Sequence, residues 1–123
     1  MTKEEVLREG LKFVANGGAE ELLHGSPMWN IIAPTMGGEF FWVDLASYRR
    51  WRVQQNIIFG NCRVLDPNNW RWAWGGEDDI VTMFRMMINY VEALNENEKR
   101  IVGEKLKRAL QTGNFEKGPA GIY

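Results

Sequence analysis

The fold class is decided by residues 51–74, WRVQQNIIFGNCRVLDPNNWRWAW. Three segments rich in β-branched and aromatic residues predict strands, at residues 51–59, 62–65 and 70–74. Glycine as the first residue of Gly60-Asn61 suits a two-residue hairpin turn. Asp66 followed by Pro67 predicts a second turn, because aspartate bonds the backbone and proline fixes φ. Together with an aromatic segment at residues 40–45, FFWVDL, the stretch predicts an antiparallel meander.

The register of the first hairpin decides which side chains share a face. With Gly60-Asn61 as a two-residue turn, Phe59 pairs with Cys62 and Ile57 with Val64, and directly opposite residues lie on one face. One face is then apolar and is expected to pack on the helices; it carries Trp51, Val53, Ile57, Phe59, Cys62 and Val64. The other face carries Arg52, Gln54, Asn56, Ile58, Arg63 and Leu65.

The second turn decides where three tryptophans lie. If residues 66–69 form a four-residue loop, Leu65 pairs with Trp70 and Arg63 with Trp72. Trp70, Trp72 and Trp74 then join the arginine-bearing face. A loop longer or shorter by one residue would place them in the core instead, because a slip of one residue reverses every side chain. Both placements stay open from the sequence.

Helical patterns flank the predicted sheet. Residues 2–5, TKEE, match a capping box, and apolar residues at helical spacing follow until residues 16–18, NGG. Apolar stripes recur from Ile80 to Leu94 and from Ile101 to Leu110, separated by a short turn at residues 95–97. We therefore predict an α+β fold: an N-terminal helix, an antiparallel three- or four-stranded meander, and a C-terminal αα-hairpin packed on one sheet face.

Length and composition bound the organisation and location. The chain has 123 residues, a formal net charge of -1 and 45% hydrophobic residues, which is typical of one globular domain. We expect residues 1–113 to form a single α+β domain and residues 114–123 a loose tail. The single cysteine, the charged N-terminus and the lack of an apolar run of about 20 residues predict a cytoplasmic protein without a membrane partner.

The residues for common catalytic chemistry are largely missing. His24 is the only histidine and Cys62 the only cysteine, so the sequence excludes a zinc site of known spacing. His24 is expected to cap a short helix, and Cys62 to be a small buried residue with an unreactive thiol. The three acids at residues 77–79 suit the first turn of a helix. We predict no catalytic residue, no metal site and no cofactor.

Charge and tryptophan content point to a binding surface. Residues 47–74 hold five arginines, one acid and no lysine, which gives this segment a charge of +4. The chain has six tryptophans, and tryptophan and arginine are enriched in interface hot spots. The predicted binding residues are Arg50, Arg52, Gln54, Arg63, Trp70, Trp72 and Trp74.

These features favour a small non-catalytic binding protein whose Trp/Arg-rich sheet face engages another protein or a second copy of the chain. An alternative is a module for single-stranded nucleic acid, in which arginines bind phosphates and tryptophans stack on bases. A further alternative is a small-ligand-binding protein or an enzyme with a pocket between sheet and helices. A carbohydrate platform of tryptophan with Gln or Asn stays open as well.

Overall fold

The computed structural model describes residues 1–18, 33–34 and 41–112 of the chain. Its elements are α1 (Lys3–Ala15), β1 (Ala33–Pro34), β2 (Trp42–Tyr48), β3 (Trp51–Asn56), β4 (Cys62–Leu65), β5 (Trp70–Gly75), α3 (Glu77–Glu92) and α4 (Glu96–Thr112). The predicted α+β fold, with an N-terminal helix, an antiparallel sheet and two C-terminal helices, is confirmed. The predictions for His24 and for the tail from residue 114 lie outside the described residues.

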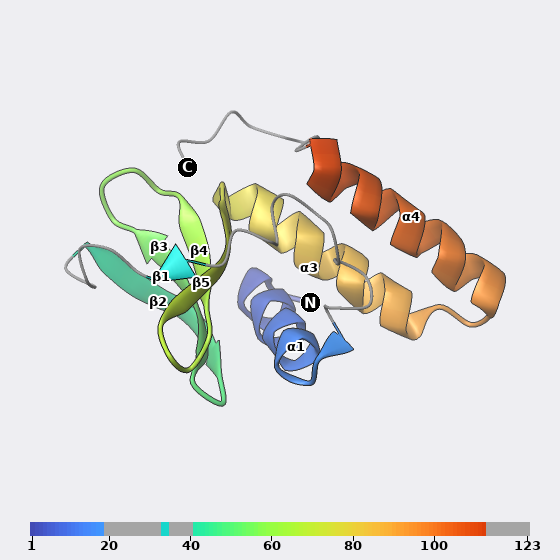
Figure 1. Cartoon of the computed structure of the whole chain (residues 1–123), viewed down its shortest axis with the longest axis horizontal. Helices are drawn as coiled ribbons and strands as arrows, with labels where there is room; N and C mark the ends of the chain where they lie inside the picture. Colours follow the sequence, from blue (N-terminus) through green and yellow to red (C-terminus); the bar gives the residue numbers. More distant parts are fainter. Residues whose placement is uncertain (19–32, 35–40, 113–123) are drawn as a thin grey trace.

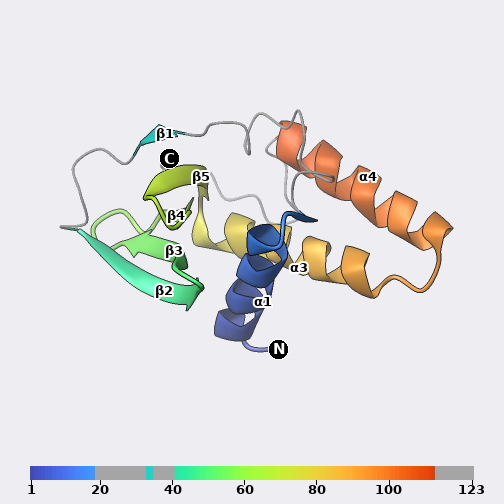
Figure 2. The same cartoon turned by 60° about the horizontal axis from the view of Figure 1, so that its bottom comes forward.

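The sheet has the strand order β1-β5-β4-β3-β2, and every neighbouring pair is antiparallel. Strands β2 to β5 follow one another along the chain and form the predicted meander. The two-residue β1 adds a short strand outside β5, where Ala33 pairs with Arg71. Figure 2 shows β1 beyond β5 at this edge of the sheet.

The helices form layers on one side of the sheet. Helix α1 packs on β2 and β3 and also against α3, while α3 contacts β5. Helix α4 packs along α3, on the side away from α1 and the sheet (Figures 1 and 2). The C-terminal helical hairpin therefore contacts the sheet through α3.

Helix α1 has the boundaries that its sequence predicts. The Thr2 hydroxyl accepts a hydrogen bond from the Glu5 amide at 3.1 Å, and the Glu5 carboxylate accepts one from the Thr2 amide at 3.4 Å. This reciprocal pair satisfies two amides that a helix start leaves without intrahelical partners. Gly17 follows the helix with a φ of +82°, a conformation that glycine adopts without steric cost.

The core is formed by α1, α3, α4 and the inner face of the sheet. Phe84 of α3 is its largest fully buried side chain and faces Gly10 of α1. A Cβ added to Gly10 would stand 2.2 Å from Phe84 Cγ, so glycine lets the two helices approach closely. The apolar stripe of α3 is buried from Ile80 to Met87 only. Leu94, predicted to continue the stripe, lies beyond the helix and is 91% exposed.

The predicted two-residue turn at Gly60-Asn61 is wrong, because the strands join through residues 57–60. Val53 pairs with Val64 and Gln55 with Cys62, a shift of four residues from the predicted pairing. The cause is Asn56, whose Oδ1 accepts hydrogen bonds from the amides of residues 58 and 59 at 2.9 and 3.0 Å. A shift of the pairing register by an even number of residues leaves each side chain on its predicted face of the sheet. Val53 and Val64 are therefore buried in the core as predicted. Ile57 and Phe59, predicted for the core face, lie in the loop instead.

The predicted pairing across the second turn is also wrong. Arg63 pairs with Trp74 rather than Trp72, and a bulge places Leu65 opposite Arg71 rather than Trp70. In the turn itself, Asp66 Oδ1 accepts hydrogen bonds from the amides of residues 68 and 70 at 2.8 and 2.9 Å.

The bulge moves Trp72 to the inner side of the sheet. Its indole packs against Trp51, with ring centroids 5.6 Å apart, and both rings adjoin the core. The indole N–H donates to Asp66 Oδ2 at 2.9 Å, which satisfies the one polar group of this side chain. The prediction that Trp72 lies opposite Arg63 on the outer face is therefore wrong.

Candidate binding surface

Two turns lie at the same end of the sheet. Residues 49–50 join β2 to β3, and residues 66–69 join β4 to β5. Because consecutive antiparallel strands reverse direction, both turns lie at one end and the 57–60 loop at the other. Figure 1 shows the two turns at the lower end of the sheet and the loop at its upper end.

The first turn consists of two arginines. Arg49 and Arg50 have φ values of +47° and +67°, the backbone that a two-residue hairpin of type I′ requires. Asparagine and glycine usually occupy such positions, since a left-handed conformation costs other residues about 1 kcal/mol or more. Both arginines are exposed. The Arg49 guanidinium lies 5.3 Å from the centroid of the Tyr48 ring, and Lys12 Nζ lies 5.8 Å from the same centroid.

The second turn contributes a tryptophan and holds a third arginine. Asn69, with a φ of +65°, accepts a hydrogen bond from Arg52 Nη2 through its Oδ1. Trp70 follows directly and is 43% exposed. Within residues 1–18, 33–34 and 41–112, all three non-glycine residues with positive φ lie in these two turns. We call Arg49, Arg50, Arg52 and Trp70 the turn-end surface.

The turn-end surface is positively charged. The acid of the second turn, Asp66, has both carboxylate oxygens engaged with backbone amides and with the Trp72 indole. Lys12 forms an ion pair with Glu9 at 3.1 Å within α1. Hydrogen bonds from neutral donors leave the negative charge of Asp66 in place, so three arginines stand against one carboxylate and the charge at this end is positive. Guanidinium groups bind carboxylates and phosphates bidentately.

The outer face of the sheet holds the other arginines in internal contacts. Arg63 is 4% exposed; its Nε and Nη2 donate to Gln54 Oε1 at 3.0 and 2.9 Å. Gln54 is 2% exposed and donates to Asp44 Oδ1 at 2.9 Å. The Arg63 guanidinium stacks 3.9 Å from the centroid of the Trp42 ring. Opposite Arg63, the Trp74 ring lies 4.9 Å from the Arg71 guanidinium.

The structure divides the seven predicted binding residues into three groups. Arg50, Arg52 and Trp70 lie at the turn end, while Gln54, Arg63 and Trp74 lie on the outer face and Trp72 on the inner side. The expected single exposed surface of Arg52, Arg63, Trp70 and Trp72 does not form. Arg49 belongs to the turn end but was not among the predicted residues. A two-residue connection between Tyr48 and Trp51 was the signal that could have identified it.

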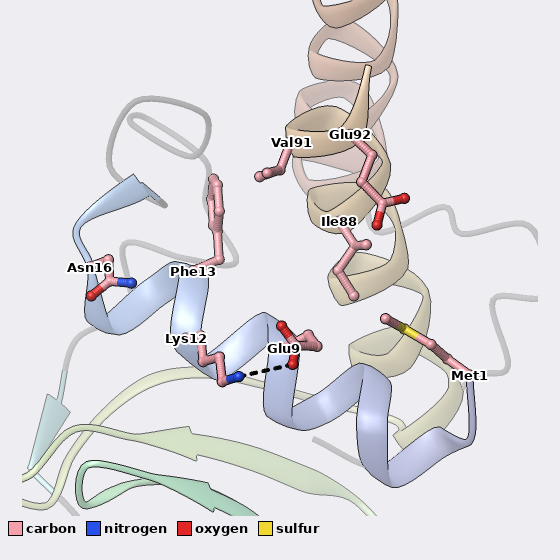
Figure 3. Close-up of a pocket in the computed structure, with 8 residues that line it drawn as sticks. All are labelled: Met1, Glu9, Lys12, Phe13, Asn16, Ile88, Val91 and Glu92. Atoms are coloured by element: carbon pink, nitrogen blue, oxygen red, sulfur yellow. Dashed lines mark hydrogen bonds and ion pairs between the residues drawn. The ribbon is translucent and has the colours of Figure 1, made fainter. Parts of the chain in front are cut away.

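A shallow groove of about 250 Å³ lies between α1 and α3 (Figure 3). Its lining residues are Met1, Glu9, Lys12, Phe13, Asn16, Ile88, Val91 and Glu92. Lys12 is paired with Glu9 here, and the lining holds no nucleophile with an adjacent base. The groove is therefore a surface feature with a mixed polar and apolar lining rather than a candidate active site.

Among the described residues, no cluster of three or more His, Cys, Asp or Glu side chains is arranged to hold a metal ion. The helices described, from α1 to α4, include none with the length and apolar character for crossing a bilayer.

The thiol of Cys62 is buried at the opposite end of the sheet from the turns. The side chain is 1% exposed, and burial, with a further contribution from the charge of Glu77, raises the pKa of the thiol to about 12. At pH 8 only about one thiol in ten thousand is then ionised, and the thiolate is the reactive species. We expect Ellman's reagent to leave the folded protein almost unmodified at pH 8 and to react fully in guanidinium chloride. Rapid stoichiometric reaction of the folded protein would show that the thiol is accessible.

Comparison with known proteins assigns no family: no family model, curated protein or solved structure matches the chain. The candidate site therefore rests on its own geometry and charge.

Proposed function

We propose that this protein is a binding protein that engages an acidic segment of a partner protein through the turn-end surface. The observation that carries the proposal is the Arg49-Arg50 turn, in which two exposed arginines occupy left-handed positions. Unfavourable backbone conformations of this kind cluster at functional sites, where the side chain is needed despite its conformational cost.

The composition of the surface supports a protein partner. Three guanidinium groups and one exposed indole at the same end of the sheet combine bidentate carboxylate binding with a large apolar contact area. Arginine and tryptophan are also the residues whose truncation most weakens protein interfaces. Asn69 holds the Arg52 side chain in place, so less conformational entropy is lost when a ligand binds.

Single-stranded nucleic acid is the second candidate, and Trp70 is the observation that favours it. An exposed indole at the same end of the sheet as the arginines could stack on a base while the arginines bind phosphates. Binding along a strand needs cations and aromatic rings along a track, however. Arg63 and Arg71 are instead stacked on Trp42 and Trp74 within the sheet. The short row of cations at the turn end therefore suits a compact acidic segment better.

The test is the double variant Arg49→Asn/Arg50→Gly, which installs the residues that a type I′ turn favours and removes both guanidiniums. We expect the fold to be retained and affinity for a ten-residue polyglutamate peptide to fall by about 30-fold, as when a hot spot is truncated. The matched control is Arg8→Gln/Arg85→Gln, which removes two exposed charges from α1 and α3.

An equal loss in the control would indicate unspecific charge attraction and contradict the proposal, as would failure of the wild type to bind the peptide. Oligothymidine provides the comparison with nucleic acid. Tighter binding of oligothymidine, with an affinity that falls steeply between 50 and 200 mM salt, would favour the nucleic-acid alternative.

A further inference from the structure

The end of the sheet opposite the arginines presents a group of exposed apolar side chains. Ile57, Ile58 and Phe59 are consecutive in the loop and are 62%, 57% and 62% exposed. Phe41, which directly precedes β2, and Val43, its second residue, are each 46% exposed. The Ile57 amide donates to the Phe41 carbonyl at 2.8 Å, so the loop and the strand start lie together. We call these five residues the apolar tip.

Hydrogen bonds fix the conformation of the loop. Asn56 Oδ1 accepts from the amides of Ile58 and Phe59, and the Asn56 carbonyl accepts from the Gly60 amide at 2.9 Å. Gln55 Nε2 donates to the Gly60 carbonyl at 3.0 Å. The loop therefore presents its apolar side chains from an ordered backbone, and little backbone entropy is lost when the tip is covered.

We propose that two copies of this chain associate through their apolar tips. A large side chain has a total accessible area of about 150–250 Å². At exposed fractions of 46–62%, each of the five side chains therefore exposes roughly 100 Å². Two tips then remove on the order of 1,000 Å² of mostly apolar surface from water, which is the lower bound for a specific interface. The expected product is a dimer of modest affinity.

Charge favours a second copy as the occupant. In a two-fold symmetric interface the same patch meets itself, so a charge near the axis would face a like charge. The five residues of the tip are all uncharged. The turn-end surface, with its arginines, would repel its own copy. The tip is thus the exposed end of the sheet that is compatible with self-association.

Pairing through β2, the outermost strand on its side of the described sheet, is a less suitable route to a dimer. The register of β2 against β3 is interrupted between Asp44 and Ala46, and such irregularities disrupt the regular ladder that edge pairing needs. The exposed carboxylate of Asp44 further opposes close approach of a second edge. Association through side chains at the tip avoids both obstacles.

The dimer would also have a consequence for binding, which rests on the proposed function. Tips that meet at a two-fold axis place the two turn-end surfaces at the far ends of the assembly. Two identical sites on one particle bind a partner with repeated acidic segments more tightly than one site does.

The test is sedimentation velocity of the full chain at about 100 μM. We expect the wild type to sediment as a species whose mass is about twice the 14.2 kDa of one chain. Ile58→Lys places a charge at the symmetric contact and is expected to weaken dimerisation roughly 100-fold or more, so that the variant is monomeric at this concentration. The matched control Leu94→Lys removes an apolar side chain that is 91% exposed elsewhere, and it should stay dimeric. Arg49→Asn/Arg50→Gly should also stay dimeric, which separates this proposal from the one for the turn-end surface.

A pair of opposite charges distinguishes loss of the contact from misfolding. Ile58→Lys and Ile58→Glu should each be monomeric and folded by circular dichroism, and their equimolar mixture should form a mixed dimer. A monomeric wild type, an Ile58→Lys variant as dimeric as the wild type, or a mixture that stays monomeric would each overturn the proposal.

Discussion

Replacement of Phe84 by alanine is expected to lower the free energy of unfolding by about 3–5 kcal/mol. The phenyl ring is fully buried where α3 meets α1, and it fills the space that the missing Cβ of Gly10 leaves open. Truncation would remove both the apolar burial and the contacts across the helix pair, and rigid helices cannot close such a cavity completely. Guanidinium denaturation at a fixed protein concentration measures the loss.

Two further variants test the cause of that loss. Phe13→Ala, at a partly exposed phenylalanine in the α1–α3 groove, should have a clearly smaller effect. Gly10→Ala should destabilise the wild type, because its new methyl group collides with the Phe84 ring. The same change should be tolerated, or even stabilising, in the Phe84→Ala background. An unchanged midpoint for Phe84→Ala would show that this face of α3 does not form the core.

Local signals in the sequence were sufficient for helices α1, α3 and α4 and for the approximate positions of β2 to β5. They did not predict β1, and residues 57–59, predicted as strand, lie in a loop. The capping box at Thr2 and Glu5 and the glycine after α1 act through the nearest few residues, and both appear in the structure as predicted. Alternation of apolar and polar residues likewise identified Val53 and Val64 as inner residues. That assignment survived the wrong pairing because the register error was an even number of residues.

The register, and with it the exposed surface, was harder to predict because side-chain hydrogen bonds set the 57–60 loop and the 66–69 turn. Asn56 lengthens the first connection, and Asp66 binds the backbone and the Trp72 indole in the second. These bonds depend on the three-dimensional path of the chain rather than on residue periodicity. The bulge beside Leu65 then separated the tryptophans between the two sides of the sheet. Charge counting located the arginines within one segment but could not tell exposed ones from buried ones.

Among the arginines of this segment, burial has its largest expected energetic effect at Arg63, which is 4% exposed. We expect Arg63→Ala to lower the free energy of unfolding by about 2–4 kcal/mol. The substitution would leave Gln54 Oε1 without the two guanidinium donors that it accepts from, at a site 2% exposed. It would also remove the planar group stacked on Trp42. Arg63→Lys should recover only part of the loss, since an ammonium group cannot reproduce the stacking and the paired donation together.

Arg50→Ala is the matched comparison, because Arg50 is an exposed arginine predicted for the same binding role. Its side chain lies at the turn end, so its removal should change the unfolding free energy by about 0.5 kcal/mol or less. Arg50→Ala should instead weaken binding of the polyglutamate peptide. Urea denaturation and peptide titration of both variants measure the two effects. If Arg63→Ala unfolds at the wild-type midpoint but loses peptide binding, Arg63 is a binding residue, and the site lies on the outer face of the sheet rather than at the turn end.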